Sequence, residues 1–207
     1  MALINPPAAH EAEHAPRRHA RDCNALQAQL QAATPEERRW AARDLADCPD
    51  SAPALVARLL EEPDGSVREV ILTTLTRLGD ARAVEGLVQC MRSDDAALRN
   101  EAIEAMKQLP EAVAPLMRSL LADEDSDMRI FAVNILESLR HPEVKTWLAE
   151  VVEHDPHINV CATAVDLLGE VGSRAVLEPL LRMRLRFANE PYIQFAADLA
   201  IKRILES

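Results

Sequence analysis

The stretch DGSVREVILTTLTRLG, residues 64–79, decides the fold. It begins with a turn at Asp64-Gly65, where an aspartate can cap the start of a helix. Val67, Ile71 and Leu75 then recur every four residues, which places them on one face of that helix. The stretch therefore predicts a turn followed by an amphipathic helix that ends at Leu78-Gly79.

The arginine of this stretch, Arg68, has counterparts along the chain at separations of 30, 31 and 30 residues. They are Arg38, Arg68, Arg99 and Arg129. The last three follow an aspartate by four residues, and those aspartates are Asp64, Asp95 and Asp125. A period of about 30 residues that carries one helix pair is typical of an α-solenoid.

The repeats can be overlaid by taking the residue before each arginine as the first position of a second helix. The first position then reads Glu37, Val67, Leu98, Met128, Val160 and Ile193. The fifth and ninth positions are apolar in all six units, as one helix face requires. We predict an all-α, right-handed α-solenoid of about six helix pairs over residues 22–207, preceded by a disordered tail over residues 1–21.

Composition agrees with this class. The chain has 48% hydrophobic residues but only 3% aromatic ones, and only five glycines, which suits packed helices better than a β fold. No run of about 18 apolar residues is present. The four cysteines are widely spaced, so we expect buried free thiols in a cytoplasmic protein.

The charge is strongly acidic and unevenly spread. The net charge is −11, and residues 22–172 carry 28 acidic against 14 basic residues. Phosphate contacts supply most of the affinity for nucleic acids, so an acidic body disfavours a nucleic-acid partner.

The repeats resemble the HEAT repeat family. The resemblance rests on Asp64-Gly65-Ser66-Val67-Arg68 with Leu78-Gly79, and on the related run from Asp125 to Arg129. It implies that the aspartates and arginines form a structural ladder between neighbouring turns. Phycobilin lyases contain similar short repeats, so the resemblance also implies an alternative function as a bilin lyase or cofactor-insertion chaperone.

No residue pattern indicates catalysis. The chain has no P-loop, no G-x-G-x-x-G and no H-E-x-x-H, so we expect no catalytic, cofactor-binding or metal-binding residues. The tightest group of potential ligands is His154, Asp155 and His157 beside Pro156, and a metal site there stays an open hypothesis. The expected function is non-catalytic.

The concave side of a solenoid, lined by second helices, is the surface that we expect to bind another protein. Apolar residues among its charged ones are typical of a protein-binding hot spot. The candidate binding residues are Arg39, Trp40, Arg43, Val70, Glu101, Glu104, Ile130 and Phe131. We therefore predict an adaptor or scaffold whose partner is another protein.

The last repeat differs from the others. Arg182, Arg184 and Arg186 alternate with apolar residues near its start. Such a basic end suggests self-association with the acidic body of a second copy, although basic residues also favour the end of a solvated helix.

Overall fold

The structure, a computed structural model, describes residues 22–206. Within that range the chain is helical and contains no strand. The predicted tail over residues 1–21 lies outside the described residues, as do the histidines within it. No helix of residues 22–206 is long and apolar enough to cross a bilayer.

The helices of the first three repeats are α1 (Cys23–Gln29), α2 (Pro35–Asp44), α3 (Ala52–Glu61), α4 (Gly65–Leu78), α5 (Ala81–Met91) and α6 (Ala96–Lys107). Those of the last three are α7 (Pro110–Val113), α8 (Met117–Leu121), α9 (Ser126–Leu136), α10 (Val144–His154), α11 (Ile158–Val171), α12 (Leu177–Arg186) and α13 (Pro191–Glu206). Short 3-10 segments are η1 (Leu45–Asp47), η2 (Ala114–Leu116) and η3 (Arg174–Val176).

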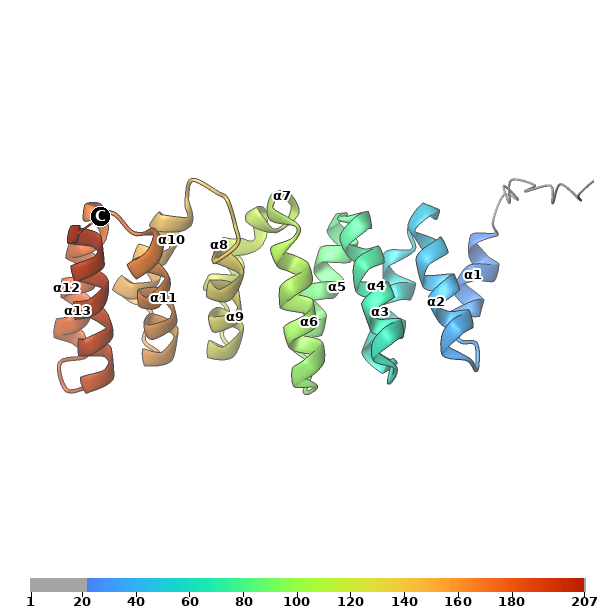
Figure 1. Cartoon of the computed structure of the whole chain (residues 1–207), viewed down its shortest axis with the longest axis horizontal. Helices are drawn as coiled ribbons and strands as arrows, with labels where there is room; N and C mark the ends of the chain where they lie inside the picture. The colour runs from blue at the N-terminus through green and yellow to red at the C-terminus, as the bar shows by residue number, and fades with distance from the viewer. Residues whose placement is uncertain (1–21, 207) are drawn as a thin grey trace, which may run out of the picture.

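These helices form six antiparallel pairs that stack in chain order along one long axis (Figure 1). The second helices α2, α4, α6, α9, α11 and α13 contact one another in sequence and form one layer. The first helices form the other layer. The predicted α-solenoid is confirmed.

The core lies between the two layers and follows the predicted columns. Val67, Ile71 and Leu75 are fully buried, and the equivalent positions of the other inner repeats are buried as well. Trp147 of α10 is 3% exposed and packs in the core. Leu116 lies in η2, where Pro115 interrupts the first helix of the fourth repeat, and Met117 is fully buried beside it.

Aspartates begin several helices by accepting hydrogen bonds from free backbone N–H groups. Asp64 Oδ1 accepts from the N–H groups of Ser66 and Val67 at the start of α4. Gly79 ends the same helix in the left-handed conformation, at φ 56°, which glycine adopts without strain. The local signals in residues 64–79 thus set both ends of α4.

The prediction of four free thiols is wrong for one pair. Cys23 at the start of α1 and Cys48 after η1 form a disulfide, with their Cα atoms 5.8 Å apart. The two cysteines are 25 positions apart in the sequence, so their proximity could not be predicted from spacing and arises because the helix pair folds back on itself. Cys90 and Cys161 are buried free thiols as predicted, and burial raises the pKa of each to about 11.

Candidate functional site

The surface formed by outward-pointing side chains of the second helices is the candidate binding site, and we refer to it as the second-helix face. The third and seventh positions of these helices point away from the first-helix layer. In α4 and α6 they are Glu69, Thr73, Asn100 and Glu104, all of which are exposed. The sequence predicts partner binding on this same surface.

The four apolar residues proposed as anchors differ in exposure. Trp40 is 47% exposed, and the Arg43 guanidinium lies 4.1 Å from the centre of its ring. Val70, Ile130 and Phe131 are half-buried and pack against the core. Neighbouring second helices lie close enough to cover most of these three side chains. Trp40 is therefore the most exposed of the four proposed anchors.

The charged candidates also have internal contacts. Arg39 Nη1 donates to Ser66 Oγ at 2.8 Å, which links α2 to α4. Glu104 forms an ion pair with Lys107 at 3.0 Å. Glu101 is half-buried, and its Oε2 atom is buried without a hydrogen-bond partner among the described residues.

An apolar stripe on α13 is absent from the sequence-based candidates. Tyr192, Phe195 and Leu199 are 61%, 67% and 38% exposed. Phe195 and Leu199 occupy the third and seventh positions of the sixth second helix, where inner repeats carry mostly polar residues. Comparing the third and seventh positions of the sixth repeat with those of the earlier repeats would have identified Phe195 and Leu199.

The last repeat holds most of the exposed apolar side chains. Of eight large hydrophobic residues exposed in the part of the chain that the structure describes, six belong to α12 and α13. They are Leu181, Leu185, Tyr192, Phe195, Leu199 and Leu205. Exposed apolar patches favour contact with other apolar groups, and in residues 22–206 such side chains are concentrated in α12 and α13.

Three hollows lie between successive second helices. One of about 240 Å³ between α2 and α4 is lined by Trp40, Arg43 and Val70. One of about 810 Å³ lies between α4 and α6, and one of about 260 Å³ lies between α9 and α11. The second-helix face therefore offers recesses that can receive side chains.

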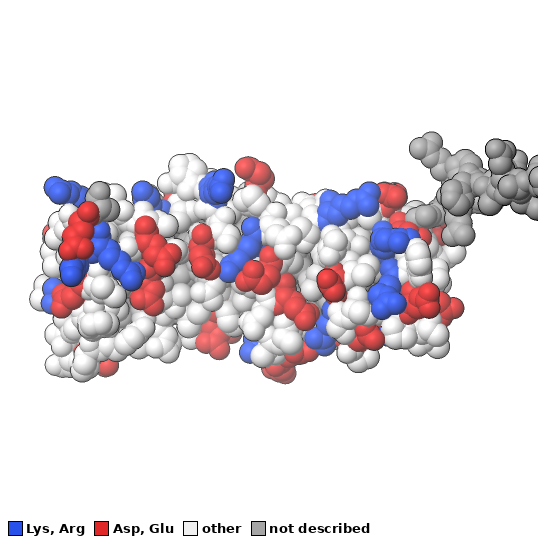
Figure 2. All heavy atoms as spheres, in the orientation of Figure 1, with Lys and Arg blue, Asp and Glu red and all other residues white. Residues whose placement is uncertain are grey.

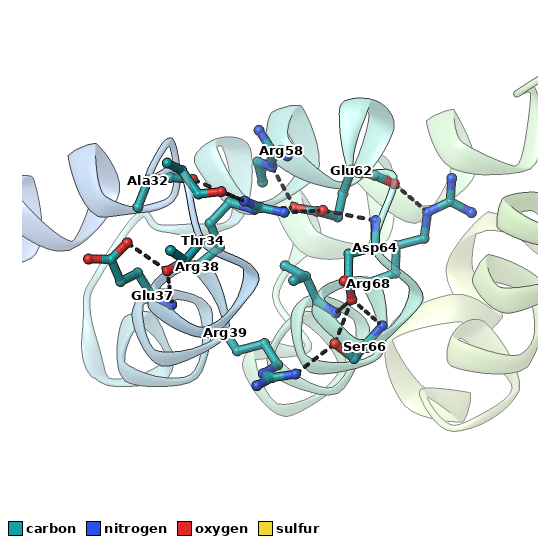
Figure 3. Close-up of polar contacts among 12 residues, drawn as sticks. Ala32, Thr34, Glu37, Arg38, Arg39, Arg58, Glu62, Asp64, Ser66 and Arg68 are labelled. Atoms are coloured by element: carbon teal, nitrogen blue, oxygen red, sulfur yellow. Dashed lines mark hydrogen bonds and ion pairs between the residues drawn. The ribbon is translucent and has the colours of Figure 1, made fainter.

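The marker arginines lie at the edge of this face and connect the repeats. Arg38 donates through Nε and Nη2 to the two carboxylate oxygens of Glu62, both at 2.8 Å, and Arg58 donates to Glu62 as well (Figure 3). Burial alone would raise the pKa of Glu62, but these hydrogen bonds outweigh it and hold that pKa at about 2. The Arg38–Glu62 pair thus joins repeat one to repeat two.

The partners of the arginines differ from those expected. Arg68 pairs with Asp95 of the following repeat at 2.7 Å, and Arg129 pairs with Asp155 at 2.7 Å, rather than with the aspartates four residues upstream. Arg99 makes no carboxylate contact among residues 22–206 and donates to the carbonyls of Ser93 and Asp94.

The upstream aspartates have a different task, because they serve as helix caps. Asp64, Asp95 and Asp125 each accept from backbone N–H groups of the helix that they begin. Only Asp95 also accepts from an arginine of the preceding repeat. Capping engages Oδ1 of Asp95, and the Oδ2 atom of the same carboxylate accepts from Arg68.

The basic residues of the last repeat are engaged within the chain. Arg182 pairs with Glu153 at 2.8 Å, and Arg184 pairs with Asp198 at 3.1 Å. Arg186 donates to the carbonyls of Val152 and Glu153 in the preceding repeat. These contacts hold the three arginines against the chain, and Arg182 still keeps 51% of its side chain exposed, so self-association through this repeat stays a hypothesis.

The first-helix layer contains a separate cavity of about 650 Å³ between α8 and α10. Leu121, Trp147 and Val151 provide apolar wall, and Arg118 and His154 lie at its border. The carboxylate of Asp155 accepts two hydrogen bonds from Arg129. Across residues 22–206 no group of three His, Cys, Asp or Glu residues is arranged to hold a metal, and this holds for His154, Asp155 and His157.

The sequence matches the family model of HEAT repeats over residues 23–107 and 113–202. The chain belongs to the HEAT repeat family. A relative, the bilin biosynthesis protein PecE of Mastigocladus laminosus, is 29% identical over 174 residues. That match covers 82% of this chain but 62% of PecE, so the chain spans less than two thirds of its relative's length.

Solved structures of repeat proteins give weaker matches. The complex of CpcE and CpcF of phycocyanin lyase from Nostoc sp. PCC7120 matches with 19% identity, covers 95% of this chain and 100% of that chain, and has a TM-score of 0.38. An engineered protein matches with 22% identity, 90% and 100% coverage, and a TM-score of 0.43. We draw no conclusion from likenesses at these TM-scores.

Proposed function

We propose that this HEAT-repeat chain is an adaptor that holds a partner protein on its second-helix face. The observation that carries the proposal is the exposed stripe of Tyr192, Phe195 and Leu199 on α13. Aromatic side chains supply much of the binding energy at protein interfaces, and exposed apolar patches favour association. Trp40, near the other end of the face, provides a second anchor.

The test compares binding of a protein captured from the source cell to matched variants. Phe195→Glu combined with Leu199→Lys changes the stripe at exposed positions, so the fold is retained. Leu60→Lys is the control, because Leu60 is 37% exposed in the first-helix layer. The captured protein, once purified, is titrated by calorimetry against each variant.

We expect the α13 variant to weaken binding by about tenfold or more and the Leu60 variant to leave it nearly unchanged. Trp40→Ala should weaken it as well. If the captured protein binds the α13 and Trp40 variants as tightly as the unchanged chain, the second-helix face is not its binding surface.

The resemblance to PecE favours a second candidate, a role in bilin biosynthesis. The cavity between α8 and α10 offers a flat ligand an apolar wall of Leu121, Trp147 and Val151. Its charged lining is mixed, because Asp123, Glu150 and Asp155 accompany Arg118 and Arg129. A bilin is an open-chain tetrapyrrole, and its conjugated body matches the apolar wall.

This second candidate is tested by adding a free bilin to the purified chain and recording visible absorbance. A bilin held in the cavity would shift its absorption band, and Arg118→Gln would reduce that shift. An absorbance spectrum that stays identical to that of the free bilin would remove the second candidate without affecting the first.

A further inference from the structure

Two of the hollows on the second-helix face are strongly acidic. The hollow between α4 and α6 is lined by Glu69, Glu101 and Glu104, with Arg77 as its one basic residue. The hollow between α9 and α11 is lined by three more acids and no lysine or arginine. Those acids are Glu137, Asp166 and Glu170. Figure 2 shows acidic side chains over α6, α9 and α11, between more basic regions near the two ends.

Most of these carboxylates lack an internal counter-charge. Glu69, Glu101, Asp166 and Glu170 make no ion pair with any residue in the range 22–206. The other two share Lys107, which lies 3.0 Å from both Glu104 and Glu137. Arg77 is directed elsewhere, to Asp47 at 2.8 Å. The two hollows therefore keep an excess of negative charge.

Glu101 adds an observation that is independent of the charge count. Glu101 is a half-buried residue of the α4–α6 hollow, and its Oε2 atom is buried and accepts no hydrogen bond from residues 22–206. A buried acceptor without a donor costs free energy, and a charged one costs more. A cation in the hollow would lie beside this carboxylate and offset part of that cost.

We propose that the two hollows bind lysine or arginine side chains from an extended basic segment of the partner protein. This inference rests on the proposed function and specifies the chemistry of the partner. Positive side chains match the charge of both hollows, and arginine suits carboxylates because it donates several hydrogen bonds at once.

The distance between the hollows fits an extended segment. They are separated by two helix spacings in the second-helix layer, or about 16–20 Å at 8–10 Å per packed pair. An extended chain rises by about 3.3 Å per residue, so about five or six residues connect the two hollows. A segment of about ten residues would occupy both.

The probe is a fluorescent decapeptide of alternating arginine and serine. The control peptide, which has the opposite charge, is a decapeptide of alternating glutamate and serine. Binding to the full chain is measured by fluorescence anisotropy in low salt and at about 0.5 M salt. We expect the basic peptide to bind in low salt and to weaken with added salt, whereas the acidic peptide does not bind.

Two double variants test the two hollows, Glu69→Gln with Glu101→Gln and Asp166→Asn with Glu170→Gln. The control is Glu61→Gln with Glu85→Gln, which removes the same number of charges from exposed positions on α3 and α5. We expect each hollow variant to weaken the basic peptide by about tenfold and the control to change it by less than about twofold.

Equal weakening by the control would mean that the peptide responds only to net charge, and unchanged affinity in both hollow variants would place it elsewhere. Either result overturns the inference. The α13 variant keeps the two proposals separate. If the α13 variant no longer binds the captured protein but the hollow variants do not weaken the basic peptide, only the inference about a basic segment is wrong. If the α13 variant still binds the captured protein, the proposed function itself is wrong.

Discussion

The second position of the second helices is occupied by arginine in four repeats, by Cys161 in the fifth and by Gln194 in the sixth. In every repeat this side chain donates to a backbone carbonyl at the turn before its helix. Arginine alone reaches beyond that turn, from Arg38, Arg68 and Arg129 to an acid of the next repeat. The role shared by all six repeats is therefore a hydrogen bond to a carbonyl of the preceding turn. Linking neighbouring repeats is an additional role of three of the arginines.

These two tasks predict unequal costs of substitution. Arg129→Leu leaves Asp155 buried without its cation and should lower the free energy of unfolding by about 3–5 kcal/mol. Arg99→Leu removes hydrogen bonds to two carbonyls and should cost about 1–2 kcal/mol. Urea unfolding of both variants measures the difference. Equal costs would show that the inter-repeat pair adds nothing to stability.

The Glu62 carboxylate predicts a loss of stability in acid. Its pKa is about 2 in the folded chain against 4.5 ordinarily, so its contribution is complete above pH 4.5 and is lost as the pH falls toward 2. The free energy of unfolding should fall over this window more steeply for the unchanged chain than for Glu62→Gln. Parallel curves for the two proteins would contradict this role of Glu62.

At this scale the sequence predicts that the arginines are structural, but it cannot predict their partners. The aspartate four residues upstream caps its own helix in repeats two, three and four and accepts no hydrogen bond from the arginine of its own repeat. The acids that accept from the previous repeat, Glu62, Asp95 and Asp155, lie at two different positions in the turn. No fixed spacing therefore reveals them.

Among the elements, the helix pairs follow from apolar periodicity, whereas close packing between them depends on individual residues. Gly86 of α5 lies against Val56 of α3, and a Cβ atom at Gly86 would come within 2.1 Å of the valine side chain. Nothing in the repeat pattern of the sequence predicts this close approach. The close packing of α3 against α5 is what requires a glycine at position 86.

The first helix pair predicts an effect of reduction. The Cys23–Cys48 disulfide ties the start of α1 to the end of η1, and a crosslink over 25 residues stabilises by about 3 kcal/mol through the unfolded chain. A reductant should therefore speed hydrogen exchange in α1 and α2 while the later helices change little. The Cys23→Ser, Cys48→Ser variant is the control, and it should not respond to reductant.

For the whole molecule, the sequence predicts the solenoid, but it does not predict how far each apolar residue of the second-helix face is exposed. Ile130 and Phe131 appear exposed in a single helix and are half-buried once neighbouring helices are present. Phe195 and Leu199 lie on α13, and within residues 22–206 no later second helix covers them. Exposure in a stacked protein depends on neighbours, so it is a property of the assembled solenoid.

The most direct test of the account is hydrogen exchange of the full chain with and without the purified captured protein. We predict slower exchange in the second helices α2, α4, α6, α9, α11 and α13, with the first helices α3, α5 and α12 nearly unchanged. Protection confined to the first helices would contradict the claim that the second-helix face holds the partner.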